Sequence, residues 1–324
     1  MTTRRRLFGL VPAVGAAMAG AASAARGQAW PAHSIRIIVP YAPGGATDIV
    51  ARIVGAAIGT EFGQSVVIDN RSGGAGNIAM EQAAQAASDG YTFVVTTVAQ
   101  AVNQTLFRKI GYNLERNFVP VAFLSYYSFI MVVNSDLPVK SLQDLIALAR
   151  QRPINYASTG NGSAPHIGTS LLCNMANFEM THVPYRGSGP AVTDLMSGAF
   201  QVMFDSPPSV LPHIRSGKFR AIAVSGLQRI PELPDVPTVA ESGVAGFELI
   251  GWNGLLAPAG TPAAIVTKMN EAVARAEAEP QVKERYEQAG ARPRTMTPEE
   301  FGAFLHNEVT KWAPVVLKSG AQVD

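Results

Sequence analysis

Short β-rich runs alternate with helical patterns along most of this chain, and that alternation limits the folds open to it. It predicts an α/β fold with largely parallel sheets. The predicted strands are 35–39, 65–69, 92–96, 129–134, 155–158, 181–185, 202–205 and 221–225. Segments with apolar spacing of three and four lie between most of them, such as 49–62 and 142–149. The end of the chain differs, because 261–279, 280–289 and 298–317 read as successive helices without a strong strand between them.

The composition is that of a globular chain without a strong charge preference. Of the 324 residues, 47% are hydrophobic and 15% are charged, which excludes a disordered chain. The formal net charge is +2, so we expect no nucleic-acid partner. The body of the chain contains no uninterrupted apolar run of about 20 residues, which argues against a membrane span. The single cysteine, Cys173, excludes an intramolecular disulfide. We expect a monomer.

The N-terminus has the layout of a secretory signal. Three arginines at 4–6 precede an apolar, small-residue run at 7–22. Cleavage after Ala24 and cleavage after Ala29 both remain open, and so does a twin-arginine export route. We therefore predict that residues 1–29 are a signal peptide and that the mature protein is exported.

The first site motif follows the strand predicted at 35–39. Two glycines, Gly44 and Gly45, permit close backbone approach, and the helix that follows supplies free N–H groups with partial positive charge. That combination suits a carboxylate or a phosphate. A plain strand–helix connection with Thr47 or Asp48 as N-cap is the alternative, and Asp48 would face the ligand only if the ligand also carried an amino group. The candidate contacts here are Tyr41, Gly44, Gly45, Ala46, Thr47 and Asp48.

A glycine-rich segment at 73–79 formally matches a dinucleotide fingerprint. The strand predicted at 92–96 should then end in an acidic residue for the ribose hydroxyls, but it runs into Val98, Ala99 and Gln100. We therefore interpret the segment as a rim of the same cleft and expect no cofactor.

The second site motif follows the strand predicted at 155–158. Small hydroxyl residues, glycines and a helix start bring N–H and O–H donors together without a fixed cation, which suits reversible carboxylate binding. His166 has an alternative role as a hydrogen-bonding residue of the helix start. The candidate contacts are Ser158, Thr159, Asn161, Gly162, Ser163 and His166.

Two further turns add polar groups. Tyr185, Arg186 and Gly187 follow the strand predicted at 181–185, where Arg186 has the choice between a bidentate contact with a carboxylate and an exposed surface role. Asp205 ends another strand, and it either lines the cleft or caps the helix that begins after it. Turns at the carboxyl ends of strands are where open α/β sheets bind ligands.

The motifs that are missing favour binding over catalysis. The five histidines have no metal-ligand spacing, and no G-x-S-x-G or P-loop motif occurs. With no nucleophile, metal site or nucleotide site in the sequence, we expect a binding protein and not an enzyme.

Taken together, the motifs resemble those of one family. The segments that carry the resemblance are PYAPGGATDIVAR, DNRSGGAGN, YASTGNGS, VPYRG and the late GWNGLLAPAGTP at 251–262. In this order they are similar to the Bug, or TctC-type, substrate-binding proteins of tripartite tricarboxylate transport systems. The resemblance covers about residues 30–324.

The resemblance implies a periplasmic, two-lobe fold of the type II Venus-flytrap class, with a ligand cleft between α/β lobes. We expect residues 30–125 plus 251–324 in lobe 1 and residues 126–250 in lobe 2. It further implies a receptor that captures a small carboxylate: a tricarboxylate, a dicarboxylate, an acidic amino acid or an aromatic acid. The implied partners are TctA/TctB-like membrane subunits.

Two alternatives stay open. A sensor that hands the same ligand to a signalling protein would have the same binding chemistry. An exported α/β enzyme acting on a carboxylate would need an acid/base pair, for which Asp48, His166 and Asp205 are the cleft-facing candidates.

Overall fold

The computed structural model describes residues 30–319 and 323, so the predicted signal peptide at 1–29 lies outside the described residues. The chain from Pro31 onward forms one compact unit. That unit contains two five-stranded sheets, each covered by helices.

The first sheet has the strand order β2-β1-β3-β10-β4. β1 pairs in parallel with β2 and β3, whereas β10 runs antiparallel to β3 and β4. The apolar run IRIIV of β1 is almost wholly buried, as expected for a central strand with helices on both faces. The strands are β1 (Ile35–Val39), β2 (Val66–Asn70), β3 (Thr92–Thr97), β4 (Phe118–Ser128) and β10 (Ile250–Pro258).

The second sheet has the strand order β7-β6-β8-β5-β9. β6 pairs in parallel with β7 and β8, and β5 runs antiparallel to β8 and β9. Each sheet therefore contains one strand that opposes the other four. The strands are β5 (Ile130–Asn134), β6 (Asn155–Ser158), β7 (Thr181–Pro184), β8 (Val202–Asp205) and β9 (Phe219–Val224).

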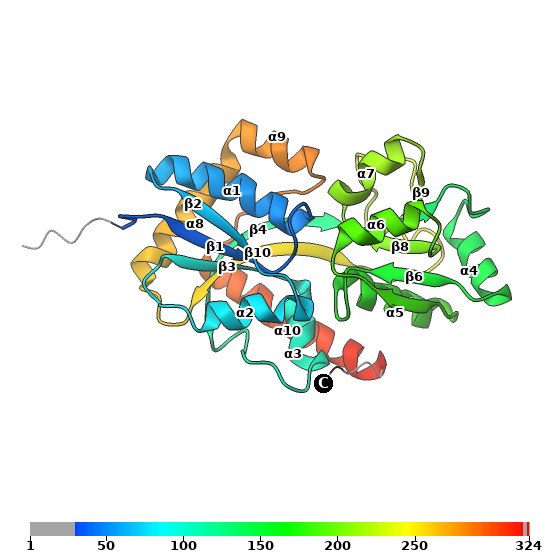
Figure 1. Ribbon diagram of the computed structural model, residues 1–324, viewed down its shortest axis with the longest axis horizontal. Helices are drawn as coiled ribbons and strands as arrows, with labels where there is room; N and C mark the ends of the chain where they lie inside the picture. The colour runs from blue at the N-terminus through cyan, green and yellow to red at the C-terminus, as the bar shows by residue number, and fades with distance from the viewer. Residues whose placement is uncertain (1–29, 320–322, 324) are drawn as a thin grey trace, which may run out of the picture. The chain divides into compact units, whose positions relative to one another are not determined.

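Helices cover both faces of each sheet. In Figure 1, α1, α8 and α9 lie on one face of the first sheet and α2, α3 and α10 on the other, while α6 and α7 lie opposite α5 on the second sheet. The three successive helices predicted at the end of the chain are present as α8, α9 and α10. The bounds are α1 (Ala46–Phe62), η1 (Gly74–Gly76), α2 (Asn77–Ala84), α3 (Val98–Leu106), α4 (Leu142–Gln151), α5 (Ala164–Ala176), α6 (Ser188–Met196), α7 (Pro207–Arg215), α8 (Ala263–Ala278), α9 (Pro280–Gln288) and α10 (Pro298–Ser319).

Two long strands, β4 and β10, were not predicted from the sequence. They pair with each other along the edge of the first sheet (Figure 1). Glycine and proline weaken a strand signal, and β10 contains Gly251 and Gly254 while β4 contains Pro120. The glycines are explained by packing, because a Cβ at Gly254 would lie 2.1 Å from the Phe301 ring. The glycines that make room for aromatic rings therefore obscured the strand pattern in the sequence.

The chain passes between the two sheets near Phe129, Ser225 and Leu249, which are joined by hydrogen bonds. β4 ends in the first sheet at Ser128, and β5 begins in the second at Ile130. Ser225 joins the crossings: its Oγ accepts the Phe129 N–H at 2.8 Å and donates to the Leu249 carbonyl at 2.5 Å. The lobe limits at 125/126 and 250/251 stay a prediction, but the strands themselves change sheet at Phe129 and return at Ile250.

Candidate functional site

Five helices begin around one cavity of about 550 Å³. Each follows a strand directly or through a short loop: α1 after β1, α3 after β3, α5 after β6, α6 after β7 and α7 after β8. The first-turn residues that line the cavity are Ala46, Val98, Ala164, Ser188 and Pro208. A helix N-terminus carries partial positive charge. Four of the five also offer unpaired N–H groups; α7 does not, because it begins with Pro207 and Pro208 and its Ser209 N–H donates to the Ser206 carbonyl. In the described part of the chain, one arginine, Arg186, lines it and no lysine does.

The first loop, which we define as residues 40–45, is held from behind by Asp48. The Gly44 N–H donates to Asp48 Oδ2 at 2.9 Å, and the Asn70 side-chain amide donates to Oδ1 at 2.9 Å. Arg52 Nε donates to the same carboxylate at 3.0 Å. Burial alone would raise the pKa of Asp48, but the hydrogen bonds from Arg52, Gly44 and Asn70 outweigh it and hold the pKa below its ordinary value. Asp48 is therefore ionised and fully partnered.

The glycine at position 44 has a structural reason. Its φ of 89° lies in the left-handed region, which favours glycine. The N-cap of α1 is Gly45, which has no side chain to bond the first turn. The expectation that Thr47 or Asp48 is the N-cap was therefore wrong, because the helix starts earlier and Asp48 occupies its third position.

The second loop, which we define as residues 159–163, is held from behind by His166. The Gly162 N–H donates to His166 Nδ1 at 3.1 Å, so that nitrogen is the unprotonated one. The His166 ring stacks on His182 with centroids 4.0 Å apart, and His182 Nε2 lies 2.7 Å from Ser158 Oγ. Burial lowers the pKa of His166 to about 4, and burial together with His166 lowers the pKa of His182 to about 3. Both rings are neutral at neutral pH.

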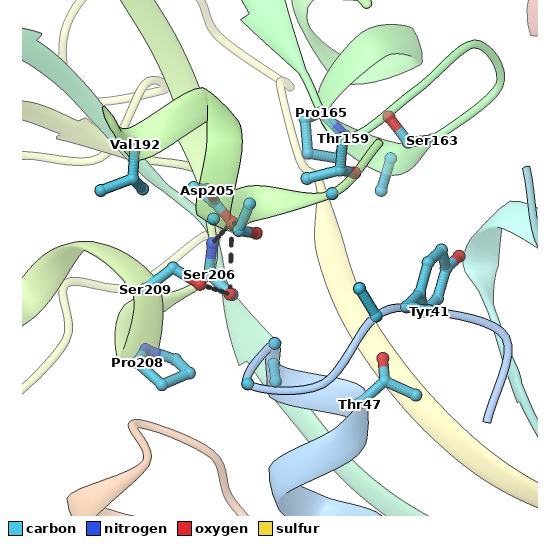
Figure 2. A pocket seen from close by; sticks show the side chains of 18 of the residues that line it. Tyr41, Thr47, Thr159, Ser163, Pro165, Val192, Asp205, Ser206, Pro208 and Ser209 are labelled. Carbon is cyan, nitrogen blue, oxygen red and sulfur yellow. Dashed lines mark hydrogen bonds between the residues drawn. The ribbon is translucent and has the colours of Figure 1, made fainter. Parts of the chain in front are cut away.

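Asp205 gives one side of the cavity a different character. Its Oδ1 accepts the Ser188 hydroxyl at 2.8 Å and the Ser206 N–H at 2.6 Å, whereas the buried Oδ2 has no partner among the described residues. Burial raises the pKa of Asp205 to about 6, against the lowering effect of the Ser206 and Ser188 hydrogen bonds. Figure 2 shows Asp205, Ser206 and Ser209 grouped apart from Tyr41, Thr47 and Ser163.

The start of α3 belongs to the cavity but was not predicted as part of the site. Thr97, Val98 and Ala99 line it, and Thr97 Oγ1 lies 3.1 Å from the Tyr41 hydroxyl. Thr97 and Gln100 form a capping box. The T-x-x-Q pattern after the predicted strand was the signal that would have revealed this helix start. Other lining residues that were not predicted include Tyr127, Phe129, Ser188, Val192, Ser206, Ser209 and His213.

The structure brings ten of the predicted contact residues to the cavity and leaves six behind it. Those that line it are Tyr41, Gly44, Gly45, Ala46, Thr47, Thr159, Ser163, Arg186, Gly187 and Asp205. Asp48, Ser158, Asn161, Gly162, His166 and Tyr185 do not line it. The Tyr185 hydroxyl instead donates to Asp194 Oδ2 at 2.8 Å. Ligand contact by any of the sixteen stays a prediction.

Within residues 30–319 and 323, no three His, Cys, Asp or Glu side chains gather closely enough to hold a metal ion. Among those residues there is also no helix that is long and apolar enough to cross a membrane.

Comparison with known proteins places these features in context. Residues 50–321 match the model of the tripartite tricarboxylate transporter family receptor, TctC. Protein BugT of Bordetella pertussis is 35% identical over 311 residues, covering 95% of this chain and 95% of BugT.

Two solved structures share the fold closely. R. palustris Rpa4515, solved with adipate, has a TM-score of 0.87 and 36% identity, covering 91% of this chain and all of that one. MatC (Rpa3494) from Rhodopseudomonas palustris, solved with bound malate, has a TM-score of 0.83 and 33% identity, covering 89% of this chain and all of that one. These likenesses confirm the predicted fold class, an α/β two-lobe periplasmic-binding-protein fold.

Proposed function

Because this chain belongs to the TctC family of solute-binding receptors, we propose that it is a periplasmic receptor for a small carboxylate. It holds the acid between the first and second loops and delivers it to the membrane subunits of a tripartite tricarboxylate-type transporter. The acids to consider are dicarboxylates such as adipate and malate, tricarboxylates, acidic amino acids and aromatic acids.

The convergence on one cavity of four helix N-termini with free N–H groups, those of α1, α3, α5 and α6, carries this proposal. First-turn N–H groups have no acceptor within their own helix. In the described residues, those of Ala46, Thr47, Val98, Ala164 and Ser188 have no other acceptor either. Such groups stabilise an anion by hydrogen bonding and by the helix dipole.

The neutrality of these donors supports a carrier role. A bidentate arginine would bind a carboxylate strongly and fix its orientation, but Arg186 is exposed at the edge of the cavity and is its only arginine in the described chain. Backbone donors offer several hydrogen bonds without a buried charge. A receptor that must release its acid to a transporter is well served by such a site.

The relatives support the ligand class. Rpa4515 was solved with adipate and MatC with malate, and both share about a third of their residues with this chain. The cavity volume of about 550 Å³ lies within the usual range for small-molecule sites.

The first experiment is a thermal-shift panel on protein beginning at Trp30, unfolded and refolded to remove bound acid. The panel contains adipate, malate, citrate, succinate, glutamate and benzoate, with adipamide and succinamide as uncharged analogues. An acid at about a thousand times its Kd should add roughly 4 kcal/mol of stability, on the order of ten degrees in Tm. Shifts by the amides equal to those by the acids would contradict a carboxylate site.

A variant that fills the cavity tests the site, and a surface variant with the same added side chain is its matched control. Gly45 has an ordinary φ of −80°, and a Cβ there would meet nothing within 4 Å. Gly45→Leu should therefore fold normally and abolish binding by occupying the space of the acid. Ala56→Leu adds the same side chain to an exposed position of α1 and should bind like the wild type. Delivery is tested by uptake of the labelled acid into cells that carry the membrane subunits, with and without this receptor.

A further inference from the structure

Tyr127 is a buried residue whose hydroxyl has no hydrogen-bond partner among the described residues. Tyr127 is 9% exposed and lines the cavity, and its hydroxyl forms no hydrogen bond with any described residue. Buried tyrosine hydroxyls usually find a partner, and other tyrosines of this chain do. The pairs are Tyr41 with Thr97, Tyr112 with Asn77, Tyr156 with Ser170, Tyr185 with Asp194 and Tyr286 with Glu277.

The position of the Tyr127 ring is fixed by the strand beside it. Tyr127 of β4 pairs with Gly251 of β10. A Cβ at position 251 would lie 2.4 Å from Cε2 and Cζ of the ring and 2.9 Å from its hydroxyl oxygen, so any side chain there would displace the ring. The ring also packs edge-on against Phe129, with centroids 5.1 Å apart. The hydroxyl is thus presented from a rigid part of the first sheet, next to the crossing between the sheets.

The hydroxyl acts as a donor at neutral pH. Burial raises the pKa of Tyr127 well above its ordinary value, and electrostatic interaction with the ionisable groups of Tyr41 and Asp205 raises it further. A phenol that keeps its proton supplies one O–H donor. An oxygen of a bound acid would accept this hydrogen bond, and it would also accept hydrogen bonds from the N–H groups of the neighbouring helix starts.

We propose that Tyr127 is a ligand-binding residue whose hydroxyl donates a hydrogen bond to an oxygen of the bound acid, with Gly251 as the residue that positions its ring. This inference rests on the proposed function and adds a side-chain contact from the connecting strand β4 to the backbone donors of the two loops.

The test compares Tyr127→Phe with the wild type, using the acid from the panel above that binds the wild type most tightly. Loss of a hydrogen bond to a charged oxygen should lower the affinity at least about tenfold, as measured by calorimetry. The Tm of the acid-free variant should be unchanged or higher, since the change removes a hydroxyl that has no hydrogen-bond partner in the acid-free protein. Gly251→Ala, which displaces the ring but keeps its hydroxyl, should also weaken binding.

The control is Tyr112→Phe, a buried tyrosine outside the cavity. Its hydroxyl donates to Asn77 Oδ1 at 2.9 Å, so this variant should lose stability and keep its affinity. Wild-type affinity in Tyr127→Phe, or a lower Tm without an affinity loss, would overturn the role of Tyr127 alone. A wild type that binds no acid of the panel would instead overturn the proposed function and this inference with it.

Discussion

The two loops that face each other across the cavity follow one plan and differ in how they are anchored. In each, a glycine with positive φ lies two residues before the helix: Gly44 before α1 and Gly162 before α5. Each glycine donates its N–H to the side chain four residues later, at the third position of the helix. That side chain is an ionised carboxylate, Asp48, in the first loop and a neutral imidazole, His166, in the second.

This difference indicates which property of the anchoring side chain the loop shape requires. Both anchors must accept a hydrogen bond from behind the loop, which leaves the other N–H groups of the helix start free for a ligand. A charge is tolerated at Asp48 because Arg52 and Asn70 share it. Among the described residues His166 forms no ion pair and its ring stacks on His182, so its neutral form is the compatible one. The first loop should therefore be the more strongly fastened, and the second the more sensitive to acid.

The largest expected effect is that of Asp48→Ala. The change removes acceptors for Gly44, Arg52 and Asn70 and should cost about 3 kcal/mol of unfolding free energy, together with the binding of the acid. His166→Ala removes a single hydrogen bond and part of a ring stack, and should cost about 1 kcal/mol. Denaturant titrations of both variants give the comparison. Equal losses would show that the two anchors are equivalent after all.

Lowering the pH should weaken the second loop before the first. The pKa of His166 is about 4 in the folded protein and about 6.5 when unfolded. The unfolded state therefore binds more protons between these values, and the free energy of unfolding falls as the pH drops. Between pH 7 and pH 5 the loss due to His166 is about 2 kcal/mol. Asp48, whose pKa lies below its ordinary value, keeps its charge over this range.

The variant His166→Gln isolates this effect, because glutamine offers an acceptor that does not titrate. Asp205, with its pKa raised to about 6, and Glu277, with its pKa raised to about 8, contribute the opposite slope in both proteins. The wild type should therefore lose more unfolding free energy than the variant when the pH is lowered from 7 to 5. Parallel pH profiles for the two proteins would contradict a neutral His166.

The smallest effects come from removing one N–H at a time. Ala46 and Ala164 are the first residues of α1 and α5, and the residues before them are extended, as a following proline requires. Ala46→Pro and Ala164→Pro should each lower affinity about tenfold, the loss expected for one charged hydrogen bond. The Tm without acid should be unchanged or slightly higher. A fall in Tm without an affinity loss would mean that these N–H groups serve the fold alone.

The sequence was sufficient to predict the strand–helix alternation and most of the two loops. Periodicity and Gly/Ser turns reveal strand ends, so a helix was expected after each of the two loops, where α1 and α5 begin. The strands β4 and β10 could not be predicted, since Gly251 and Gly254 serve aromatic rings that lie far away in sequence. Tertiary packing overrode the local signal there.

The direction of a side chain is the second thing that the sequence does not contain. Asp48 and His166 occupy helix starts, where a side chain can face the ligand or reach back to the loop. In the structure both side chains reach back to the loop, where they accept the Gly44 and Gly162 N–H groups. No sequence motif marked Tyr127, a residue that belongs to the hydrophobic core and also lines the cavity.

In the proposed mode of binding, the two loops hold the same carboxylate through backbone N–H groups. A double-mutant cycle on acid binding tests it most directly, with wild type, Ala46→Pro, Ala164→Pro and the double variant measured by calorimetry. Two donors on one carboxylate should be coupled, so the double variant should depart from the sum of the single losses by more than about 0.5 kcal/mol. Strictly additive losses, or no loss in either single variant, would contradict a carboxylate shared between the loops.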